Sequence, residues 1–192
     1  MKKDDYKKQI NYYLEKTSLT EHRNKKNRQL SGGMKRRVGL IQALLHNPSI
    51  LIVDEPTTGL DPEERIRIRN LLVDFAKNRT VLFSTHVTED IAATCDKLCI
   101  MRKGKIVYDG SISALISVVE NHVFTCMFHD EAEFQRFQKD YRVASKIYKA
   151  DAIEVRFVSA DVPRIPCKKC EPSLEEAYIY HLYVKEKEEG IQ

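Results

Sequence analysis

Apolar residues in the first part of the chain recur at helical spacing, which predicts amphipathic helices with a polar outer side. One helix is expected over residues 4–16. A second is expected to begin at Gly32, capped by Ser31, and to end at Asn47-Pro48, because proline disfavours helix in the residue before it. Its apolar stripe consists of Met34, Val38, Ile41, Leu44 and Leu45. The basic residues expected to stay on its outer side are Lys35, Arg36 and Arg37.

Two short aliphatic runs, at residues 49–53 and 80–84, predict strands that are buried on both faces, as in a parallel sheet covered by helices. Between them, Asp61-Pro62 followed by two acids is a strong start for a helix that reaches Asn78. A further helix is expected over residues 88–94. The order strand, helix, strand, helix predicts an α/β fold with parallel strands.

The second part of the chain shows a different pattern of expected elements. A hairpin with a tight turn at Lys103-Gly104 is expected over residues 97–108, followed by a helix over 111–119. Beyond Asn121 the expected elements are strands at 122–128 and 152–157, a helix at 131–139 and a last helix at 174–184. A loop that carries prolines and cysteines precedes this last helix. Residues 121–192 therefore predict a small α+β appendage.

The composition is that of a globular protein. Of the 192 residues, 42% are hydrophobic and 31% are charged, and no apolar run approaches the roughly 20 residues that cross a bilayer. The first residues contain no apolar stretch of the kind that marks a secretory signal. If the protein works at a membrane, we therefore expect it to dock on a partner that spans the bilayer.

Two features leave alternatives open. The basic run at residues 23–37 is either a solvated face or a surface for nucleic-acid phosphates, and it lacks the interleaved aromatics of a stacking platform. The five cysteines are expected to be reduced thiols. Cys167 and Cys170 form a C-x-x-C pair that is either a loop with two free thiols or part of a metal site. Further ligands for such a site would be Cys126, His129 and His181, whose spacing matches no common zinc module.

Chemically useful side chains follow the two aliphatic strands. Asp54 and Glu55 end the first strand, and His86 follows the second. In a parallel sheet, ligands bind beyond the carboxyl ends of the strands, so neighbouring strands would bring all three groups to one edge. One carboxylate can hold Mg²⁺, the other can deprotonate an attacking water, and an imidazole can donate to phosphate oxygens. Separately, the glycine pair after Ser31 offers free amide groups for an anion at a helix N-terminus.

These groups occur in an order that resembles the nucleotide-binding subunits of the ATP-binding cassette (ABC) transporter family. Leu30-Ser31-Gly32-Gly33-Met34 resembles the signature motif, with methionine where many members have glutamine, and residues 50–55 resemble the Walker B strand with its catalytic glutamate. Residues 59–62 resemble the D-loop, and residues 84–86 resemble the switch histidine. Residues 172–177 are similar to the tail of multidrug- and antibiotic-type export ATPases. The implied fold is a P-loop-NTPase-like parallel sheet flanked by helices.

In that family two cassettes enclose two ATP molecules, and the signature of one closes on the nucleotide held by the other. The resemblance implies that Asp54 binds Mg²⁺ through water, that Glu55 is the general base and that His86 senses the γ-phosphate. The residues implied to act across the dimer are Ser31, Gly32 and Gly33 on ATP and Asp61 between the two sites. The implied partners are a second cassette and a membrane-spanning permease, which would place the chain at the inner face of the cell membrane.

The resemblance also implies a division of the chain into domains. Residues 1–120 would be the C-terminal part of a cassette, with a remnant of the helical subdomain at 1–47 and a core at 48–120. Residues 121–192 would be an accessory domain. The sequence has no G-x-x-x-x-G-K-[ST] loop, adenine-stacking aromatic or glutamine loop, so we expect that another polypeptide supplies this half or that the chain is a fragment.

Without a phosphate-cradling loop, we expect that the chain alone neither binds ATP tightly nor hydrolyses it. Two rival functions stay open beside that of a transporter subunit. One is a soluble ABC ATPase that acts on nucleic acid, an unlikely partner that only the basic run supports. The other is a degenerate cassette that serves as a non-catalytic interaction partner, against which Glu55 and His86 argue because both are intact.

Overall fold

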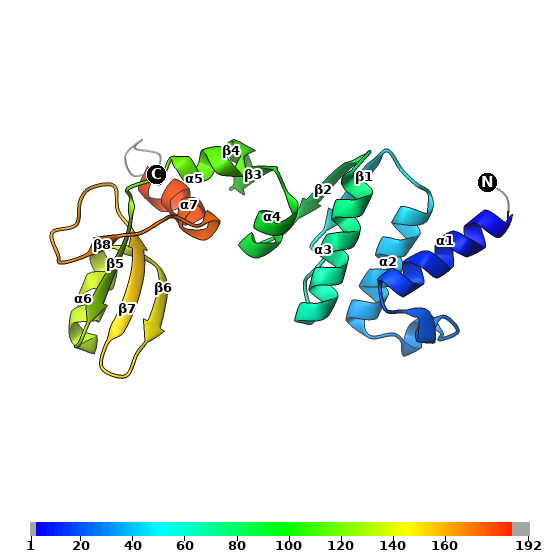
Figure 1. Ribbon diagram of the computed structural model, residues 1–192, viewed down its shortest axis with the longest axis horizontal. Helices are drawn as coiled ribbons and strands as arrows, with labels where there is room; N and C mark the ends of the chain where they lie inside the picture. Colours follow the sequence, from blue (N-terminus) through cyan, green and yellow to red (C-terminus); the bar gives the residue numbers. More distant parts are fainter. Residues whose placement is uncertain (1–2, 186–192) are drawn as a thin grey trace. The chain divides into compact units, whose positions relative to one another are not determined.

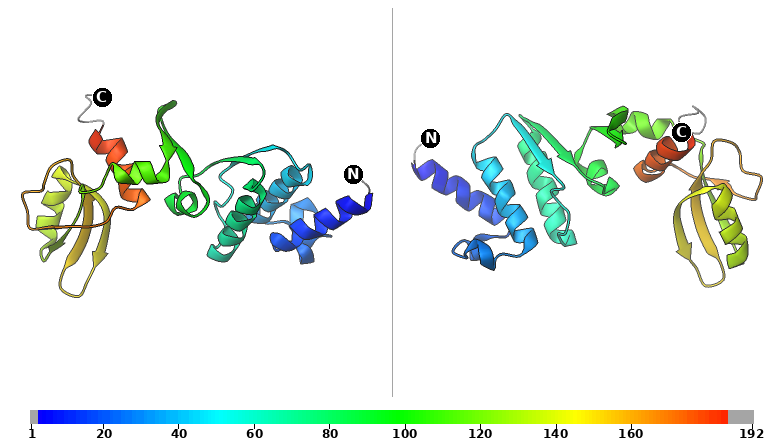
Figure 2. Two further views of the ribbon diagram at one scale, coloured as in Figure 1. Left: turned by 45° about the horizontal axis from the view of Figure 1, so that its top comes forward. Right: turned by 180° about the vertical axis from the view of Figure 1, so that it is seen from behind.

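The computed structural model describes residues 3–185 of the chain (Figure 1). It divides into two compact units, Met1–Cys95 and Asp96–Gln192, and both combine helices with strands, as the sequence predicts (Figure 2). The division into compact units falls before the hairpin. The predicted boundary at residue 120, between a cassette and an accessory domain, is a different kind of boundary and stays a prediction. None of the described helices is long and apolar enough to cross a membrane.

The first unit follows the predicted order of elements closely. Its helices are α1 (Lys3–Lys16), α2 (Gly32–Leu45), α3 (Pro62–Ala76) and α4 (Thr88–Thr94), and its strands are β1 (Ile50–Asp54) and β2 (Thr80–Ser84). Two single 3₁₀ turns, at Thr20–His22 and Asn27–Gln29, interrupt the otherwise irregular segment before α2. β1 and β2 form a parallel pair in which Asp54 lies opposite Ser84. The two strands are thus neighbours, and their carboxyl ends are level.

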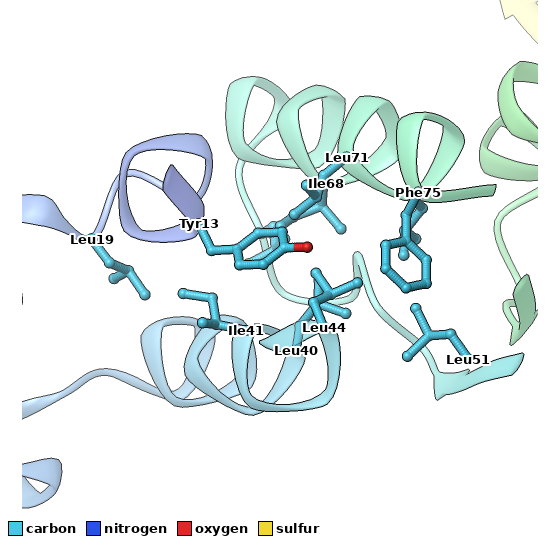
Figure 3. Packing of buried hydrophobic residues seen from close by; sticks show 11 residues of the cluster. Tyr13, Leu19, Leu40, Ile41, Leu44, Leu51, Ile68, Leu71 and Phe75 are labelled. Atoms are coloured by element: carbon cyan, nitrogen blue, oxygen red, sulfur yellow. The ribbon is translucent and has the colours of Figure 1, made fainter. Parts of the chain in front are cut away.

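One face of the β1–β2 pair packs on the helices and carries the core of this unit (Figure 3). The core residues are Tyr13, Leu19, Leu40, Ile41, Leu44, Leu51, Leu60, Ile68, Leu71, Leu72 and Phe75. The prediction that both strands are buried on both faces is wrong. Strand side chains alternate between faces, so Leu51 lies in the core while Ile52 is 73% exposed and Leu82 is 60% exposed on the other side. No described element of this unit covers that second face.

Helix α2 begins and ends where the sequence predicts, but one of its basic residues lies inside. The Ser31 hydroxyl accepts the N–H of Met34 at 3.2 Å and so caps the helix. Arg37, expected on the outer side, is only 6% exposed. Its guanidinium forms an ion pair with Glu64 and donates to the Thr17 carbonyl at 2.8 Å. A buried arginine is tolerated here because Glu64 balances its charge and the Thr17 carbonyl accepts from its guanidinium, although its Nε is buried without a hydrogen-bond partner.

The second unit contains a hairpin and a four-stranded sheet. The hairpin joins β3 (Lys97–Arg102) to β4 (Lys105–Ser111) through Lys103-Gly104, where both residues have positive φ as a two-residue hairpin turn requires. Helix α5 (Ile112–Ser117) follows. The sheet has the order β6-β7-β5-β8, and all of its pairs are antiparallel. Its strands are β5 (Val123–Phe128), β6 (Arg142–Tyr148), β7 (Ile153–Val158) and β8 (Lys168–Lys169).

Helix α6 (Glu131–Asp140) covers one face of this sheet with an aromatic core built around Phe134, Phe137 and Phe157. Helix α7 (Leu174–Tyr180) continues as one π-helical stretch, His181–Lys185. Strand β6 was not expected from the sequence. The register shifts between Val143 and Ser145, so a bulge breaks the alternation of apolar and polar residues that would have marked the strand.

Candidate functional site

The carboxyl ends of β1 and β2 bring together the acidic pair and the histidine that the sequence singles out. Asp54 is the last residue of β1, and its carboxylate accepts the hydroxyl of Ser84. Glu55 follows with φ +47°, in the left-handed region, and its N–H donates to the Ser84 carbonyl at 3.1 Å. This sharp turn at a non-glycine residue ends the strand and is strained by roughly 1 kcal/mol or more.

Glu55 and His86 are in direct contact. Nδ1 of His86 lies 2.7 Å from one carboxylate oxygen of Glu55, and the hydroxyl of Thr58 donates to the other oxygen at 2.5 Å. The Thr58 hydroxyl, followed by His86, lowers the pKa of the Glu55 carboxyl below its usual value. The carboxylate is therefore ionised at neutral pH, as a general base must be.

The edge formed by these residues is open to a ligand. The side chain of His86 is 70% exposed and that of Glu55 is 29% exposed. Within the described part of the chain, no lysine or arginine forms an ion pair with Asp54 or Glu55. The prediction that the three groups meet at one edge is thus confirmed as geometry, whereas their roles stay predictions.

The glycine pair opens α2 next to a second predicted motif. With Ser31 as the cap, the N–H groups of Gly32 and Gly33 have no carbonyl partner within the helix. A Cβ on Gly33 would lie 3.2 Å from the side chain of Leu60, whereas a Cβ on Gly32 would meet nothing within 4 Å. Gly33 is therefore covered by the Gly59-Leu60 turn of its own chain, and Gly32 is open.

The turn after Gly59 leads directly into α3. Gly59 has φ +74°, a conformation that favours glycine. Asp61 caps α3 by accepting the N–H of Glu64 at 2.8 Å, as its position before Pro62 predicts. No hydrogen bond or ion pair among residues 3–185 joins the glycine pair or Asp61 to the Asp54–Glu55–His86 cluster directly. A role of these motifs across a dimer stays a prediction.

A buried polar network that the sequence did not reveal connects the segments on either side of the Asp54–Glu55–His86 cluster. Thr57 and Asp90 are each 1% exposed, and the hydroxyl of Thr57 donates to the Asp90 carboxylate. Nε of Arg69, on α3, lies 3.4 Å from the other oxygen of Asp90. The network ties the loop that follows Glu55 to the helix that follows His86. In the sequence, Asp90 looks like any acid in the first turn of a helix.

The metal-site alternative for the cysteines gains no support. No group of three or more histidine, cysteine, aspartate or glutamate side chains among the described residues is arranged to hold a metal ion. Cys126 is buried in the aromatic core, and burial raises its pKa to about 11. Cys167 packs against the core that contains Cys126, but among the described residues the C-x-x-C pair and the proposed further ligands do not assemble into a group of three or more.

Comparison with solved structures defines the class of the protein. The structure of an ATP-binding subunit of an ABC transporter matches with a TM-score of 0.56 and 25% identity, over 62% of this chain and 50% of that one. A dimeric ATP-binding cassette in a post-hydrolysis state bound to ADP and Pi matches with a TM-score of 0.52 and 28% identity, over 58% and 49% of the two chains. The fold is that of part of an ATP-binding cassette.

Comparison with related sequences gives the same class of protein. A family model described as ABC transporter matches residues 1–58. The uncharacterised ABC transporter ATP-binding protein YxlF of Bacillus subtilis (strain 168) is 39% identical over 140 residues, 73% of this chain and 47% of that protein. The Nod factor export ATP-binding protein I of Rhizobium johnstonii is 44% identical over 107 residues, 54% of this chain and 33% of that protein. The chain belongs to the ABC transporter ATP-binding family and spans half or less of these relatives' length.

Proposed function

We propose that this chain is part of an ATP-hydrolysing subunit that works with a second cassette and a membrane-spanning permease in export. The observation that carries the proposal is the contact between Glu55 and His86, beside Asp54, at the level ends of two parallel strands. The relative named for Nod factor export supports the direction of transport. Such a subunit would act at the inner face of the cell membrane through the permease.

The acidic edge suits magnesium bound to a nucleotide. Mg²⁺ usually binds one or two carboxylates together with waters and substrate phosphates, rather than a full set of protein ligands. Asp54, whose carboxylate is oriented by the Ser84 hydroxyl and carries no cationic partner among the described residues, fits that role through water. When bound, the ion would neutralise charge on the phosphates.

Glu55 and His86 would act on the attacking water and on the γ-phosphate. Glu55 is ionised and can take a proton from water, while the Thr58 hydroxyl holds one of its oxygens in place. Nδ1 of His86 donates to the ionised Glu55, and Nε2 can donate to a phosphate oxygen when the imidazole carries both of its protons. The histidine would thus link the base to the phosphate whose charge changes in the reaction.

Ser31, Gly32, Gly33 and Asp61 would act on a nucleotide held by the second cassette. The open position of Gly32 allows an anion to approach the free N–H groups at the start of α2. Gly33 packs under Leu60, so closure of a partner on the glycine pair would also engage the turn that leads to Asp61. This would let Asp61 sense occupancy of the neighbouring site.

The 192-residue polypeptide has no P-loop sequence, and we therefore infer that by itself it neither binds ATP tightly nor hydrolyses it. Calorimetric titration of the purified chain with Mg-ATP measures this directly. We expect no detectable heat at micromolar nucleotide. Micromolar affinity, or turnover above the buffer rate, would overturn the inference and would leave the family assignment intact.

The role of Glu55 is tested in a complex of this chain with a P-loop-bearing cassette polypeptide and a permease. Glu55→Gln is expected to keep nucleotide binding and to lower kcat by about 10²- to 10⁴-fold, the usual contribution of a general base. Glu63→Gln is the matched control, because Glu63 is exposed and its ion pair is with Arg67 on its own helix. Equal turnover in the two variants would remove Glu55 as the base. Normal turnover of the Glu55→Gln complex that is lost when the P-loop partner is replaced by an inactive form would favour a non-catalytic role for this chain.

A further inference from the structure

Two cysteines of the second unit lie at the end of the β5–β8 ladder, Cys126 within β5 and Cys167 directly before the two-residue strand β8. In the β5–β8 ladder, Phe124 lies opposite Lys169 and Thr125 lies opposite Lys168. Continuing this antiparallel register by one residue places Cys126 opposite Cys167. Both side chains belong to the same aromatic core, Cys126 as a buried member and Cys167 as a partly buried residue packed against it. Directly opposed residues of an antiparallel pair share a face, so the two thiols point the same way.

The hydrogen bonds of the ladder show whether Cys126 and Cys167 occupy a hydrogen-bonded or a non-hydrogen-bonded pair of positions. The N–H of Cys170 donates to the carbonyl of Val123 at 3.1 Å, which makes that pair a hydrogen-bonded one. Hydrogen-bonded and non-hydrogen-bonded pairs alternate along the ladder, so Cys126 and Cys167 form a non-hydrogen-bonded pair. In such pairs the Cα atoms are about 4.5 Å apart and the side chains are closest, which is within the range that a disulfide spans.

We propose that Cys126 and Cys167 form a reversible cross-strand disulfide by exchange with a low-molecular-weight disulfide of the glutathione type. Nothing in the proposed ATPase chemistry uses either residue, and both lie in a different unit from Glu55. The site is a thiol modification site in the sheet of the second unit. Its product would tie the two-residue edge strand β8 to the strand β5.

The exchange takes two steps. The Cys167 thiolate, which is the more accessible of the two, attacks one sulfur of the small disulfide and releases one small thiol. The Cys126 sulfur then attacks Cys167 in the resulting mixed disulfide and releases the second small thiol. Two protein thiols are oxidised and one small disulfide is reduced to two thiols. Burial raises the pKa of both cysteines, so the reaction is expected to be slow at neutral pH and faster under mildly alkaline conditions.

The same strand geometry disfavours a disulfide between Cys167 and Cys170, the two cysteines that are closest in the sequence. Alternation along an extended strand puts Cys167 and Cys170 on opposite faces of the sheet. Cys170 lies opposite the fully buried Val123 and within electrostatic range of Arg156 and Glu176, none of which belongs to the aromatic core around Cys126. A disulfide between Cys167 and Cys170 would require the edge strand to leave the ladder.

Peptide mapping separates the two possibilities. The purified full chain is equilibrated with oxidised and reduced glutathione, free thiols are alkylated, and the chain is digested with trypsin without reduction. Trypsin cleaves after Lys168 and Lys169, so Cys167 and Cys170 fall on different peptides. We expect a cross-link between the peptides that carry Cys126 and Cys167, reversed by excess reduced glutathione. Hydrogen exchange of residues 159–171 is expected to slow in the oxidised chain.

Three variants complete the test. Cys170→Ser is the matched control and should keep the cross-link, whereas Cys167→Ser, at a partly buried position, should abolish it without changing the circular dichroism spectrum. Cys126→Ala should stop the exchange at a glutathione adduct on Cys167. A dominant Cys167–Cys170 link would overturn the proposal. So would a natively folded chain that carries only glutathione adducts, or that shows no cross-link at a large excess of oxidised glutathione.

Discussion

The buried carboxylate of Asp90 is expected to hold the candidate catalytic loop in place, and Asp90→Asn tests this. The carboxylate accepts the Thr57 hydroxyl and lies 3.4 Å from the guanidinium of Arg69. Asparagine keeps the shape of the side chain and an oxygen for Thr57, but it removes the charge that balances Arg69. The substitution therefore isolates the ion pair from the packing.

The magnitude follows from the burial of the two partners. Removing one member of a buried ion pair destabilises a protein by about 3–5 kcal/mol, because the other charge stays buried without its partner. Here the Asp90 side chain is 1% exposed and that of Arg69 is 17% exposed, so water can partly solvate the arginine once it is unpaired. We expect a loss of roughly 2–3 kcal/mol, which corresponds to about a 10²-fold change in a local opening equilibrium.

Native-state hydrogen exchange followed by mass spectrometry locates the effect. Peptides from the strand ends and α4 are expected to lose about 10²-fold in protection, while peptides of the second unit stay unchanged. Asp74→Asn is the matched control, since Asp74 forms an exposed pair with Lys77 that solvent screens, so protection should stay almost unchanged. If Asp90→Asn and Asp74→Asn alter exchange equally, the buried network does not hold the loop.

Two further predictions concern the site and its helix. Thr58→Val removes the hydroxyl that most lowers the pKa of Glu55, so this pKa is expected to rise toward the usual range of a glutamate, as a carboxyl NMR titration would show; an unchanged pKa would contradict the assignment. Because the folded-state pKa of Glu55 is lowered, the stability that its contacts contribute is present above the unfolded pKa and lost as pH falls through the folded one. Ser31→Ala is expected to destabilise the start of α2 by about 1 kcal/mol in urea unfolding, whereas Ser31→Asp keeps a cap and should be near neutral; equal losses would exclude the cap.

The cluster at the strand ends could be predicted because it depends on short-range rules. Two aliphatic strands separated by a helix are expected to be parallel neighbours, and residues that follow them must then lie at one edge. Asp54, Glu55 and His86 meet there for that reason. The caps Ser31 and Asp61 were equally predictable, since each is fixed by the few residues that follow it.

The sequence predictions that were wrong also share a physical cause, since each depended on contacts between distant parts of the chain. Aliphatic composition predicts that a strand can be buried, but it does not show which faces of the strand other elements cover. Ile52 is exposed because no described element of its unit covers the second face of the β1–β2 pair. Arg37 looked like a surface residue because periodicity cannot show that Glu64 and Thr17 lie opposite it. The bulge in β6 hid a strand whose partner, β7, was correctly expected.

The polar contacts that hold the site in place could not be predicted from local sequence patterns. The Thr57–Asp90 hydrogen bond joins residues 33 apart in the sequence, and the Arg36–Thr58 hydrogen bond joins residues 22 apart. Each ends on the loop that also carries Glu55, one from α4 and one from α2. The side chains with candidate chemistry are therefore set by strand ends, whereas their rigidity is set by long-range polar contacts. A substitution at Asp90 should thus reduce the order of the site while leaving Asp54, Glu55 and His86 chemically intact.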